Sequence, residues 1–351
     1  MFASIDGLAN RRKRYVLRFI NDEINPAEEI LTVAELVAYE FLNPEQFEPF
    51  NKQNGILRRL ERAKNLLTNS AKSQKDKAKQ EDFKLAVEEY NSAVLKLVKN
   101  GEIAKNLDGI HHLRPRMLKC ILDQVYDRAV APSVDSLSVY KPGTNNVYGE
   151  LLFPFVSRVL NDVKLKSDQV FVDLGSGVGN VVLQAALEFG CESWGCEETE
   201  NSCNLADGQL KEFAARCRLW GIQSGEVRLE RGDFCNNQPI QAALRRADVI
   251  LVNNEVFLPQ LNRTLIDLFL ECKDGCQIIS LKSFVPQGHR ISEMNCDDPI
   301  NLLDVKSGRY YEKDVSWTDG GGSYYVATKT HELLKAYEEG KLAGRSSSRS
   351  V

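Results

Sequence analysis

The sequence predicts an α/β fold, in which a mainly parallel, Rossmann-like sheet is preceded by a mostly helical flank. From about residue 141 onward, short β-rich runs alternate with helical patterns, which is typical of parallel strands joined by crossover helices. Inside this part, the stretch VFVDLGSGVGNVVLQAALEFG (residues 170–190) passes from an apolar strand through a glycine cluster into a helix. A strand, a tight glycine turn and a helix form the general nucleotide-binding unit of such sheets.

The expected strands are short apolar runs bounded by turn residues. They span residues 170–174, 194–196, 227–230, 249–253 and 277–281, and a late strand at 324–328 is expected to close the sheet. Helical patterns at 181–189 and 205–220 lie between them, in the places where parallel strands need crossovers.

The first third of the chain is expected to be helical. At 81–100, apolar residues recur at spacings of four and three, and Asn100 with Gly101 supplies a stop signal. Between Leu67 and Gln80 almost nothing is apolar, which favours an exposed loop or a frayed helix. The chain is therefore divided into a mostly helical region with basic stretches (1–138), the α/β domain (139–330), and a short helix with a disordered tail (331–351).

Composition excludes several classes of protein. The chain has 351 residues, 43% of them apolar, and a net charge of −4, which argues against a protein coated uniformly with nucleic acid. No run of about 18 apolar residues is present, so a membrane span is not expected, and the start does not resemble a secretory signal. The nine cysteines form no CxxC pair and no zinc spacing, so we expect buried, reduced thiols in an intracellular protein and no metal site.

Positive charge is concentrated in two stretches of the first third. The first comprises Arg11, Arg12, Lys13, Arg14 and Arg18; the second comprises Arg58, Arg59, Arg62 and Lys64, followed by Lys72, Lys75, Lys77 and Lys79. Two interpretations stay open at this point, namely a solvated charged face and a phosphate-binding surface.

The residues around the glycine loop favour one ligand over two others. The loop lacks the Gly-Lys-Ser/Thr ending of a phosphate loop, and its glycines have the spacing G-x-G-x-G instead of the G-x-G-x-x-G of a dinucleotide fingerprint. Asp173, just before the turn, would repel a pyrophosphate but suits an ammonium or sulfonium. Glu197 ends the next strand and could bind a ribose diol, and Asp233 with Phe234 follows the third strand and could hold an adenine. This ordered set predicts S-adenosyl-L-methionine.

Further motifs resemble those of a known family. KPGTNNVYGELL from Lys141, the glycine loop, LERGDF from Leu229, VNN with Phe257, and VSWT with SYYVAT occur in family order. Over residues 132–328 the chain resembles the disruptor-of-telomeric-silencing family, histone H3 lysine methyltransferases without a SET domain, and most of all its fungal branch. The resemblance implies a class I S-adenosylmethionine-dependent methyltransferase fold with a seven-stranded, mainly parallel sheet, and a catalytic domain at 139–330. It also implies a nuclear enzyme of chromatin regulation, telomeric silencing and the DNA damage checkpoint that methylates a lysine on the nucleosome core face.

The resemblance also implies roles for matching positions. The cofactor would be held by Tyr148, Gly149, Glu150, Asp173, Gly175, Gly177, Glu197, Asp233 and Phe234. Asn253 would lie at the methyl-transfer point, with Tyr324 as a second catalytic residue, and Phe257, Trp317 and Tyr324 would form the channel for the lysine. The partner would be the nucleosome, that is histone H3, other histones and DNA, with Lys72, Lys75, Lys77 and Lys79 as contact candidates.

One position departs from the family pattern. Glu255 stands where the family usually has an aromatic residue after the two asparagines. A carboxylate at the channel mouth could attract the lysine ammonium, whereas one pointing to solvent would have no effect. Two rival interpretations remain beside the histone methyltransferase: a methyltransferase acting on RNA or another protein, and a nucleosome-binding module whose pocket Glu255 has silenced.

Overall fold

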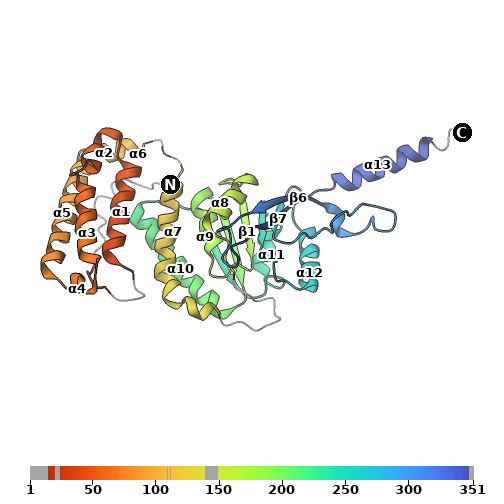
Figure 1. Cartoon of the computed structure of the whole chain (residues 1–351). Helices are drawn as coiled ribbons and strands as arrows, with labels where there is room; N and C mark the ends of the chain where they lie inside the picture. The colour runs from red at the N-terminus through yellow and green to blue at the C-terminus, as the bar shows by residue number, and fades with distance from the viewer. Residues whose placement is uncertain (1–14, 20–23, 109, 111, 139–148, 348–351) are drawn as a thin grey trace. The chain divides into compact units, whose positions relative to one another are not determined.

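The structure, a computed structural model, describes residues 15–19, 24–108, 110, 112–138 and 149–347, and for 341–347 only the backbone (Figure 1). The chain divides into two compact units. The helical unit comprises Met1–Pro132 and Phe213–Gln223, and the sheet unit comprises Ser133–Glu212 and Ser224–Val351. Among the described residues, no helix is both long enough and apolar enough to cross a membrane.

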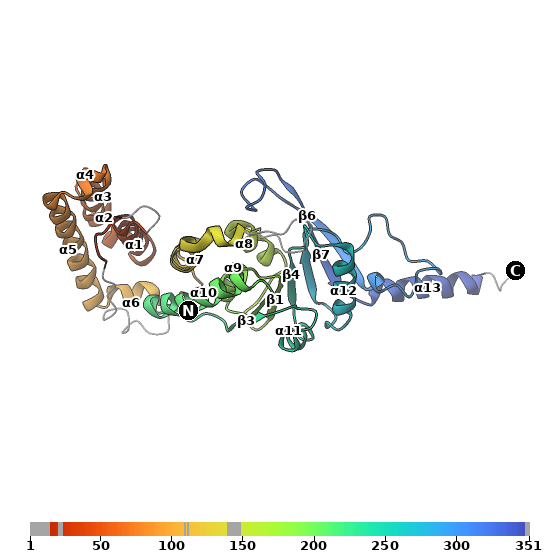
Figure 2. The ribbon, with the colours of Figure 1, turned by 90° about the horizontal axis from the view of Figure 1, so that it is seen from below.

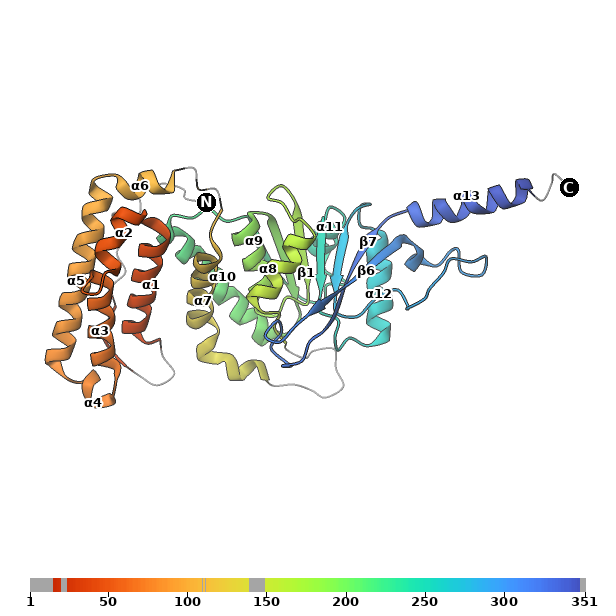
Figure 3. The same ribbon diagram turned by 45° about the horizontal axis from the view of Figure 1, so that its top comes forward.

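In the helical unit, an apolar core joins α1, α2, α3 and α5. Figures 1 and 3 show α1, α3 and α5 side by side, with Leu31, Leu60 and Phe83 among the buried residues between them. The Asn25 side chain caps the first turn of α1, and Tyr90 donates a hydrogen bond of 3.0 Å to the carbonyl of Ala34 across the core. The helices are α1 (Pro26–Phe41), α2 (Pro44–Asn51), α3 (Ile56–Thr68), α4 (Ala71–Gln74), α5 (Lys77–Lys99), α6 (Glu102–Leu107), α7 (Pro115–Ala129) and the last two turns of α10 (Glu200–Trp220).

The segment between Leu67 and Gln80, expected as an exposed loop or frayed helix, is more ordered than the sequence suggested. It contains α4 and the first turn of α5. Ser70 caps α4 by accepting a hydrogen bond from the amide of Ser73, and Asp76 caps α5 in the same way. These two caps satisfy N–H groups that an uncapped helix end would leave open, which is why so polar a segment is helical.

The sheet unit contains seven strands in the order β3-β2-β1-β4-β5-β7-β6. β1 to β5 are mutually parallel, and β7 runs antiparallel to both β5 and β6. The predicted mainly parallel sheet with crossover helices is therefore confirmed. The elements are α8 (Phe153–Asp162), β1 (Val170–Leu174), α9 (Asn180–Phe189), β2 (Glu192–Glu197), α10, β3 (Val227–Arg231), α11 (Gln238–Leu244), β4 (Val249–Val252), α12 (Pro259–Leu270), β5 (Gln277–Ser280), β6 (Leu303–Tyr310), β7 (Gly322–Lys329) and α13 (Glu332–Ser347), with 3₁₀ helices at Ala131–Ser138 and Pro299–Leu302.

Both faces of the central strands are covered by helices. On β1, Phe171 packs with residues of α8 and α9, whereas Val170, Val172 and Leu174 pack with residues of α11 and α12. Figure 2 shows α9 and α11 on opposite sides of β1. Because every side chain of β1 is buried, the strand reads as a continuous apolar run broken only by Asp173, which makes that carboxylate conspicuous.

The edge of the sheet differs from the prediction. The late strand was expected to close the sheet, but β7 lies between β5 and β6, and β6 is the edge strand. The sequence of β6, LDVKSGRY, interleaves charged and apolar residues, and only its first and last residues are buried. Charged side chains are common on edge strands, where they prevent pairing with other chains. Because of these charges, the sequence did not indicate a strand here.

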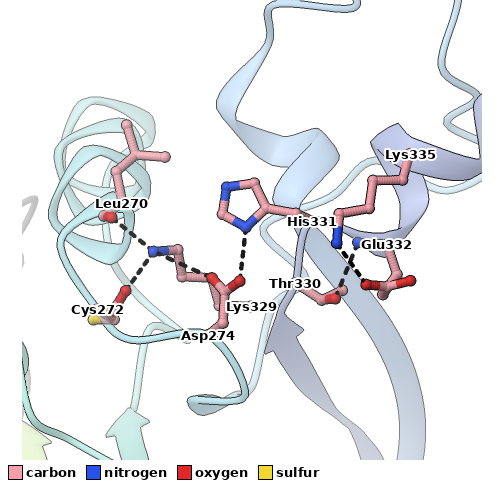
Figure 4. Close-up of polar contacts among 8 residues, drawn as sticks. All are labelled: Leu270, Cys272, Asp274, Lys329, Thr330, His331, Glu332 and Lys335. Atoms are coloured by element: carbon pink, nitrogen blue, oxygen red, sulfur yellow. Dashed lines mark hydrogen bonds and ion pairs between the residues drawn. The ribbon is translucent and has the colours of Figure 1, made fainter. Parts of the chain in front are cut away.

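A buried lysine joins the end of β7 to the end of α12. The ammonium of Lys329 donates hydrogen bonds to the carbonyls of Leu270, at 2.8 Å, and Cys272 (Figure 4). It also lies 3.8 Å from a carboxylate oxygen of Asp274, which in turn bonds to His331 at 2.8 Å. A cation at a helix C-terminus stabilises the carbonyls that the helix leaves without partners.

We expect Lys329→Met to lower the free energy of unfolding of the sheet unit by about 1–3 kcal/mol, because two carbonyls lose a charged donor. Urea denaturation followed by circular dichroism measures this change. Lys335→Met is the matched control, since Lys335 is exposed and pairs with Glu332 one turn away, and it should change stability by less than about 0.5 kcal/mol. Equal effects of the two substitutions would contradict this role of Lys329.

Candidate active site

A cavity of about 530 Å³ lies at the carboxyl ends of β1, β2, β3 and β4. Parallel strands end at the same edge of a sheet, so the residues that follow them meet there. The lining residues are Ser136, Leu137, Gly149, Glu150, Leu151, Asp173, Gly175, Ser176, Gly177, Val178, Asn180, Val181, Cys196, Glu197, Glu198, Thr199, Asn201, Ser202, Gly232, Asp233, Phe234, Cys235, Leu251, Asn253, Phe257 and Leu261. Apart from Tyr148, which lies outside the described residues, every residue expected to hold the cofactor is among them.

The glycine loop between β1 and α9 has a left-handed backbone at three positions. The φ angles of Gly175, Gly177 and Gly179 are +87°, +55° and +89°, a region that residues with a Cβ rarely adopt. A Cβ on Gly179 would also lie 3.2 Å from the side chain of Leu229. The G-x-G-x-G spacing is therefore the spacing that this turn requires, and it brings the N-terminus of α9 to the cavity.

Asp173 is the most strongly perturbed acid in the cavity. Only 3% of its surface is exposed, and burial, followed by the negative charge of Glu197, raises its pKa to about 8. A cationic group in the cavity would reverse this shift by favouring the ionised carboxylate. The electrostatics thus fit a ligand that brings a positive charge to the end of β1.

Two further acids follow β2 and β3. The Glu197 carboxylate accepts hydrogen bonds from the amides of Gly177 at 3.0 Å and Thr199 at 2.8 Å, one on each oxygen. Each oxygen keeps a second lone pair for a hydroxyl group. Asp233 is exposed and accepts from the amide of Cys235 at 2.9 Å.

Two aromatic rings flank the part of the cavity after β3 and β4. Phe234 and Phe257 are stacked, with centroids 6.4 Å apart and an interplanar angle of 27°. A Cβ on Gly175 would lie 3.8 Å from the ring of Phe257, so this ring also reaches the glycine loop. The pair offers an apolar face beside the polar groups of Asp233 and Glu197.

Asn253 connects β4 to the segment before α8. Its amide nitrogen donates a hydrogen bond of 3.3 Å to the carbonyl of Gly149. A Cβ on Gly149 would lie 2.7 Å from the ring of Trp317, so the indole packs directly against this glycine. Asn253 and Gly149 therefore meet at one side of the cavity, and Trp317 packs on Gly149 without itself being among the lining residues of the described part of the chain.

The structure places Tyr324 away from this point, which corrects the expectation of a catalytic and channel-lining residue. Tyr324 is not among the residues that line the cavity in the described part of the chain. Its ring packs against Phe155, with centroids 5.4 Å apart, and its hydroxyl donates to Asp162 at 3.3 Å. The side chain thus lies on the face of the sheet covered by α8.

Glu255 also lies outside the cavity lining of the described residues. Its carbonyl accepts a hydrogen bond from the ammonium of Lys282. Burial, and then the negative charge of Glu255, raises the pKa of Tyr310, the last residue of β6. Glu255 is half-buried, and the role of its carboxylate at the channel mouth stays a prediction.

Sequence reasoning missed a polar chain that enters the cavity from α9 and α10. Gln209 donates to the side-chain oxygen of Asn180 at 2.8 Å, and Asn180 donates to the carboxylate of Glu150 at 3.0 Å. Gln209 is almost fully buried, with 1% of its surface exposed. Asn180 could have been found as the first residue of the helix after the glycine loop, whereas nothing in the sequence indicated Gln209.

Part of the basic stretches is neutralised by ion pairs. Arg58 pairs with Glu61, Lys64 with Glu28, and Arg59 with two acids of α5. Lys72, Lys75 and Lys77 are exposed and have no ion pair within the described part of the chain, and Lys79 donates to the hydroxyl of Ser73 at 2.7 Å. Residues 11–14 lie outside the described residues.

The sheet order, the glycine loop and acids at successive strand ends together define a class of protein. This is the class I fold of S-adenosylmethionine-dependent methyltransferases, as predicted. Across the described residues, no group of three or more histidine, cysteine, aspartate or glutamate side chains could hold a metal ion.

The chain belongs to the family described as "Histone methylation protein DOT1", whose model matches residues 126–329. This confirms the resemblance seen in the sequence. The chain is 50% identical over 334 residues to a protein of Emericella nidulans, and the alignment covers 94% of this chain and 64% of that protein. It is 51% identical over 320 residues to one of Gibberella zeae, covering 91% and 63%. Both relatives are named "Histone-lysine N-methyltransferase, H3 lysine-79 specific", and this chain spans somewhat less than two thirds of their length.

Solved structures give a much more distant likeness. An RNA methyltransferase from Salinibacter ruber in complex with S-adenosyl-L-homocysteine aligns with a TM-score of 0.35 and 20% identity, covering 52% of this chain and 94% of that one. A likeness at this level carries no argument about function.

We expect Asp173→Asn to stabilise the ligand-free protein at high pH. An aspartate of the unfolded chain ionises near pH 4, whereas Asp173 in the folded chain ionises at about pH 8. Between these values the unfolded chain releases a proton that the folded chain keeps, so wild-type stability falls as the pH rises. The substitution removes this loss, and its benefit should be absent near pH 4, grow with pH, and be complete above about pH 8.

Thermal unfolding at a series of pH values checks this expectation. Asp168→Asn, which changes an exposed carboxylate just before β1, is the matched control. A gain for Asp173→Asn that does not depend on pH would show that Asp173 is ionised in the ligand-free protein.

Proposed function

We propose that this chain is an S-adenosylmethionine-dependent protein-lysine N-methyltransferase that modifies a lysine on the core face of histone H3 in the nucleosome. The observation that carries the proposal is the buried Asp173 carboxylate in a cavity that also contains Asn253 and Phe257. This arrangement offers a site for a cationic cofactor beside a partly aromatic opening. Relatives at 50% and 51% identity named as histone H3 lysine methyltransferases support the choice of substrate.

The residues present fit S-adenosyl-L-methionine. Asp173 and Glu150 would face the positively charged methionine end, Glu197 the ribose, and Asp233 with Phe234 the adenine. When bound, this cofactor supplies an activated methyl group on a sulfonium. Gly175 and Gly177 keep the backbone of the loop free of side chains, so that the ligand can approach it closely.

The acceptor lysine must lose its proton before its nitrogen can attack, and a free lysine has a pKa of about 10.4. A channel walled by Phe257 and Trp317 disfavours the charged form, and so lowers the pKa of a lysine that enters it. Asn253, held by the carbonyl of Gly149, has a side-chain oxygen available for the incoming amine. Aromatic faces also attract a methylated ammonium, which would retain it between transfers.

A nucleosomal substrate implies a nuclear protein of chromatin regulation and silencing that docks on histones and DNA. The lysines near the start of α5 are suited to such docking. Lys77 and Lys79 occupy the first turn of α5, where the helix dipole disfavours positive charge. Lys77 and Lys79 therefore do not stabilise the helix by their charge. Together with the exposed Lys72 and Lys75, they are better explained by contact with phosphates or acidic side chains than by solvation alone.

Gly177→Arg and Asn253→Ala should each abolish methyl transfer without unfolding the chain. The arginine would fill the cofactor loop, and the alanine would remove the amide that faces the acceptor. The assay is mass spectrometry of recombinant nucleosomes, free histones and RNA after incubation with enzyme and cofactor, which reports acceptor and site together. Gly275→Arg is the matched control, because Gly275 has φ +84° in an open, exposed turn, and it should retain activity.

Three outcomes would count against the proposal. Methylation of RNA or free histones in preference to nucleosomes would favour the rival substrate. Binding of nucleosomes with no turnover would favour the silenced module. Wild-type activity of a folded Gly177→Arg protein would refute the placement of the cofactor.

Neutralising Lys72, Lys75, Lys77 and Lys79 with glutamine should weaken nucleosome binding and flatten its dependence on salt. Each lost phosphate contact reduces the slope of log affinity against log salt by about 0.9. Titrations at several salt concentrations measure both quantities. The double variant Lys75→Gln/Lys77→Gln is compared with Lys96→Gln/Lys99→Gln, two exposed lysines at the other end of α5. Equal affinities of the two double variants would mean that the lysines of this segment form only a solvated charged face.

A further inference from the structure

Residues 149–151 line the cavity beside Asn253. The segment 149–152 is paired with the segment 314–317, and we call the two segments together the strap. Leu151 forms an antiparallel bridge with Val315. The amide of Leu152 donates to the carbonyl of Asp314, and that of Ser316 to the carbonyl of Glu150, both at 2.9 Å. The hydroxyl of Ser316 also accepts the amide of Glu150 at 2.8 Å. The position of Glu150 therefore depends on the position of the loop between β6 and β7.

The strap touches both halves of the site. On the cofactor side, the Glu150 carboxylate accepts a hydrogen bond of 3.0 Å from Asn180, next to the glycine loop. On the acceptor side, the carbonyl of Gly149 holds the amide of Asn253, and Trp317 packs on the same glycine. A shift of the strap would displace both sides together.

The segment 149–152 leads directly into α8, and an ion pair joins the segment 314–317 to the same helix. The guanidinium of Arg158 binds Asp314 through two contacts, of 2.5 Å and 3.4 Å. The Asp314 carboxylate is buried, with 5% of the residue exposed, and also accepts the amide of Tyr311 at 2.7 Å. The same guanidinium lies over the rings of Phe155 and Tyr311, at 5.2 Å and 5.5 Å from their centroids. A two-point guanidinium–carboxylate pair fixes direction as well as distance.

The turn that carries Asp314 needs such support. Lys313, which precedes Asp314, has φ +65°, in the left-handed region that residues with a side chain rarely adopt. Such a backbone persists only where its surroundings hold it. The amide of Tyr311 and the guanidinium of Arg158, both bound to Asp314, provide that hold.

We propose that Arg158 and Asp314 are positioning residues for methyl transfer, which act by fixing the strap and through it Glu150 and Gly149. The proposal rests on the function proposed above. Neither side chain lines the cavity among the described residues, so we expect their effect to be indirect and to pass through the strap. Transfer requires the cofactor and the acceptor to be aligned, and a displacement of about 1 Å can cost about a hundredfold in rate.

The test compares Arg158→Met, Asp314→Asn and the double variant with wild type. Methionine keeps the apolar contact with Phe155, and asparagine keeps an acceptor for the amide of Tyr311, so each change removes mainly the ion pair. Each single variant should raise the Kd for S-adenosyl-L-homocysteine at least about fivefold and lower kcat about tenfold or more. The double variant should have a Kd and a kcat no worse than those of the more impaired single variant, because both residues act through one contact.

The Kd, measured by calorimetry well below the thermal midpoint of each variant, separates positioning from simple loss of fold. Unfolded protein lowers the number of binding sites but leaves the Kd of the folded fraction unchanged. Arg158→Lys, which keeps one charged contact, should recover part of the affinity. Arg245→Met is the matched control, since Arg245 pairs with Glu271 at 2.8 Å away from the cavity.

The outcomes distinguish the two proposals. If wild type neither binds S-adenosyl-L-homocysteine nor methylates nucleosomes, the proposed function fails. If wild type does both, while Arg158→Met and Asp314→Asn stay within twofold of it in Kd and kcat, the positioning role is overturned. An effect of Arg245→Met equal to theirs would also overturn it.

Discussion

The buried carboxylate of Asp173 is the constraint from which the chemistry of the cavity follows. It lies at the end of β1, the strand that pairs with both β2 and β4, so Glu197 and Asn253 come to lie beside it. Burial without a compensating charge is costly for an acid, and here it appears as a raised pKa. The ligand-free protein therefore carries an electrostatic penalty that a cationic ligand relieves. Binding and stability are linked through this one group.

The acids at the strand ends could be predicted together because topology leaves them no other place. Parallel strands that are neighbours in a sheet end at one edge, so Asp173, Glu197 and Asp233 meet once the strands are recognised. The glycine spacing was equally informative, since it matches three left-handed positions in the turn. These features need only local sequence and the rule that parallel strands end at the same edge of a sheet.

Other features depend on contacts that local sequence does not contain. Tyr324 lies on a strand whose register decides which face it occupies, and a slip of one residue would reverse its direction. β6 was missed because its exposed positions carry charges, and Gln209 was missed because its partners lie about thirty residues away. The link between Arg158 and Asp314 spans 156 residues, and neither residue has a motif of its own.

The strap shows why the added strands matter to a site built on the first four. The carboxyl ends of β1 to β4 supply the groups that hold a ligand, but none of them covers it. The loop between β6 and β7 returns to the cavity and pairs with the segment before α8, where it fixes Glu150 and packs on Gly149. Because β7 is antiparallel, the loop that precedes it lies at the same edge as the parallel strand ends. The antiparallel strand thus brings a second segment to the cavity, in contact with the glycine loop side through the hydrogen bond between Asn180 and Glu150. Under the proposed function, the acceptor would enter beside this segment.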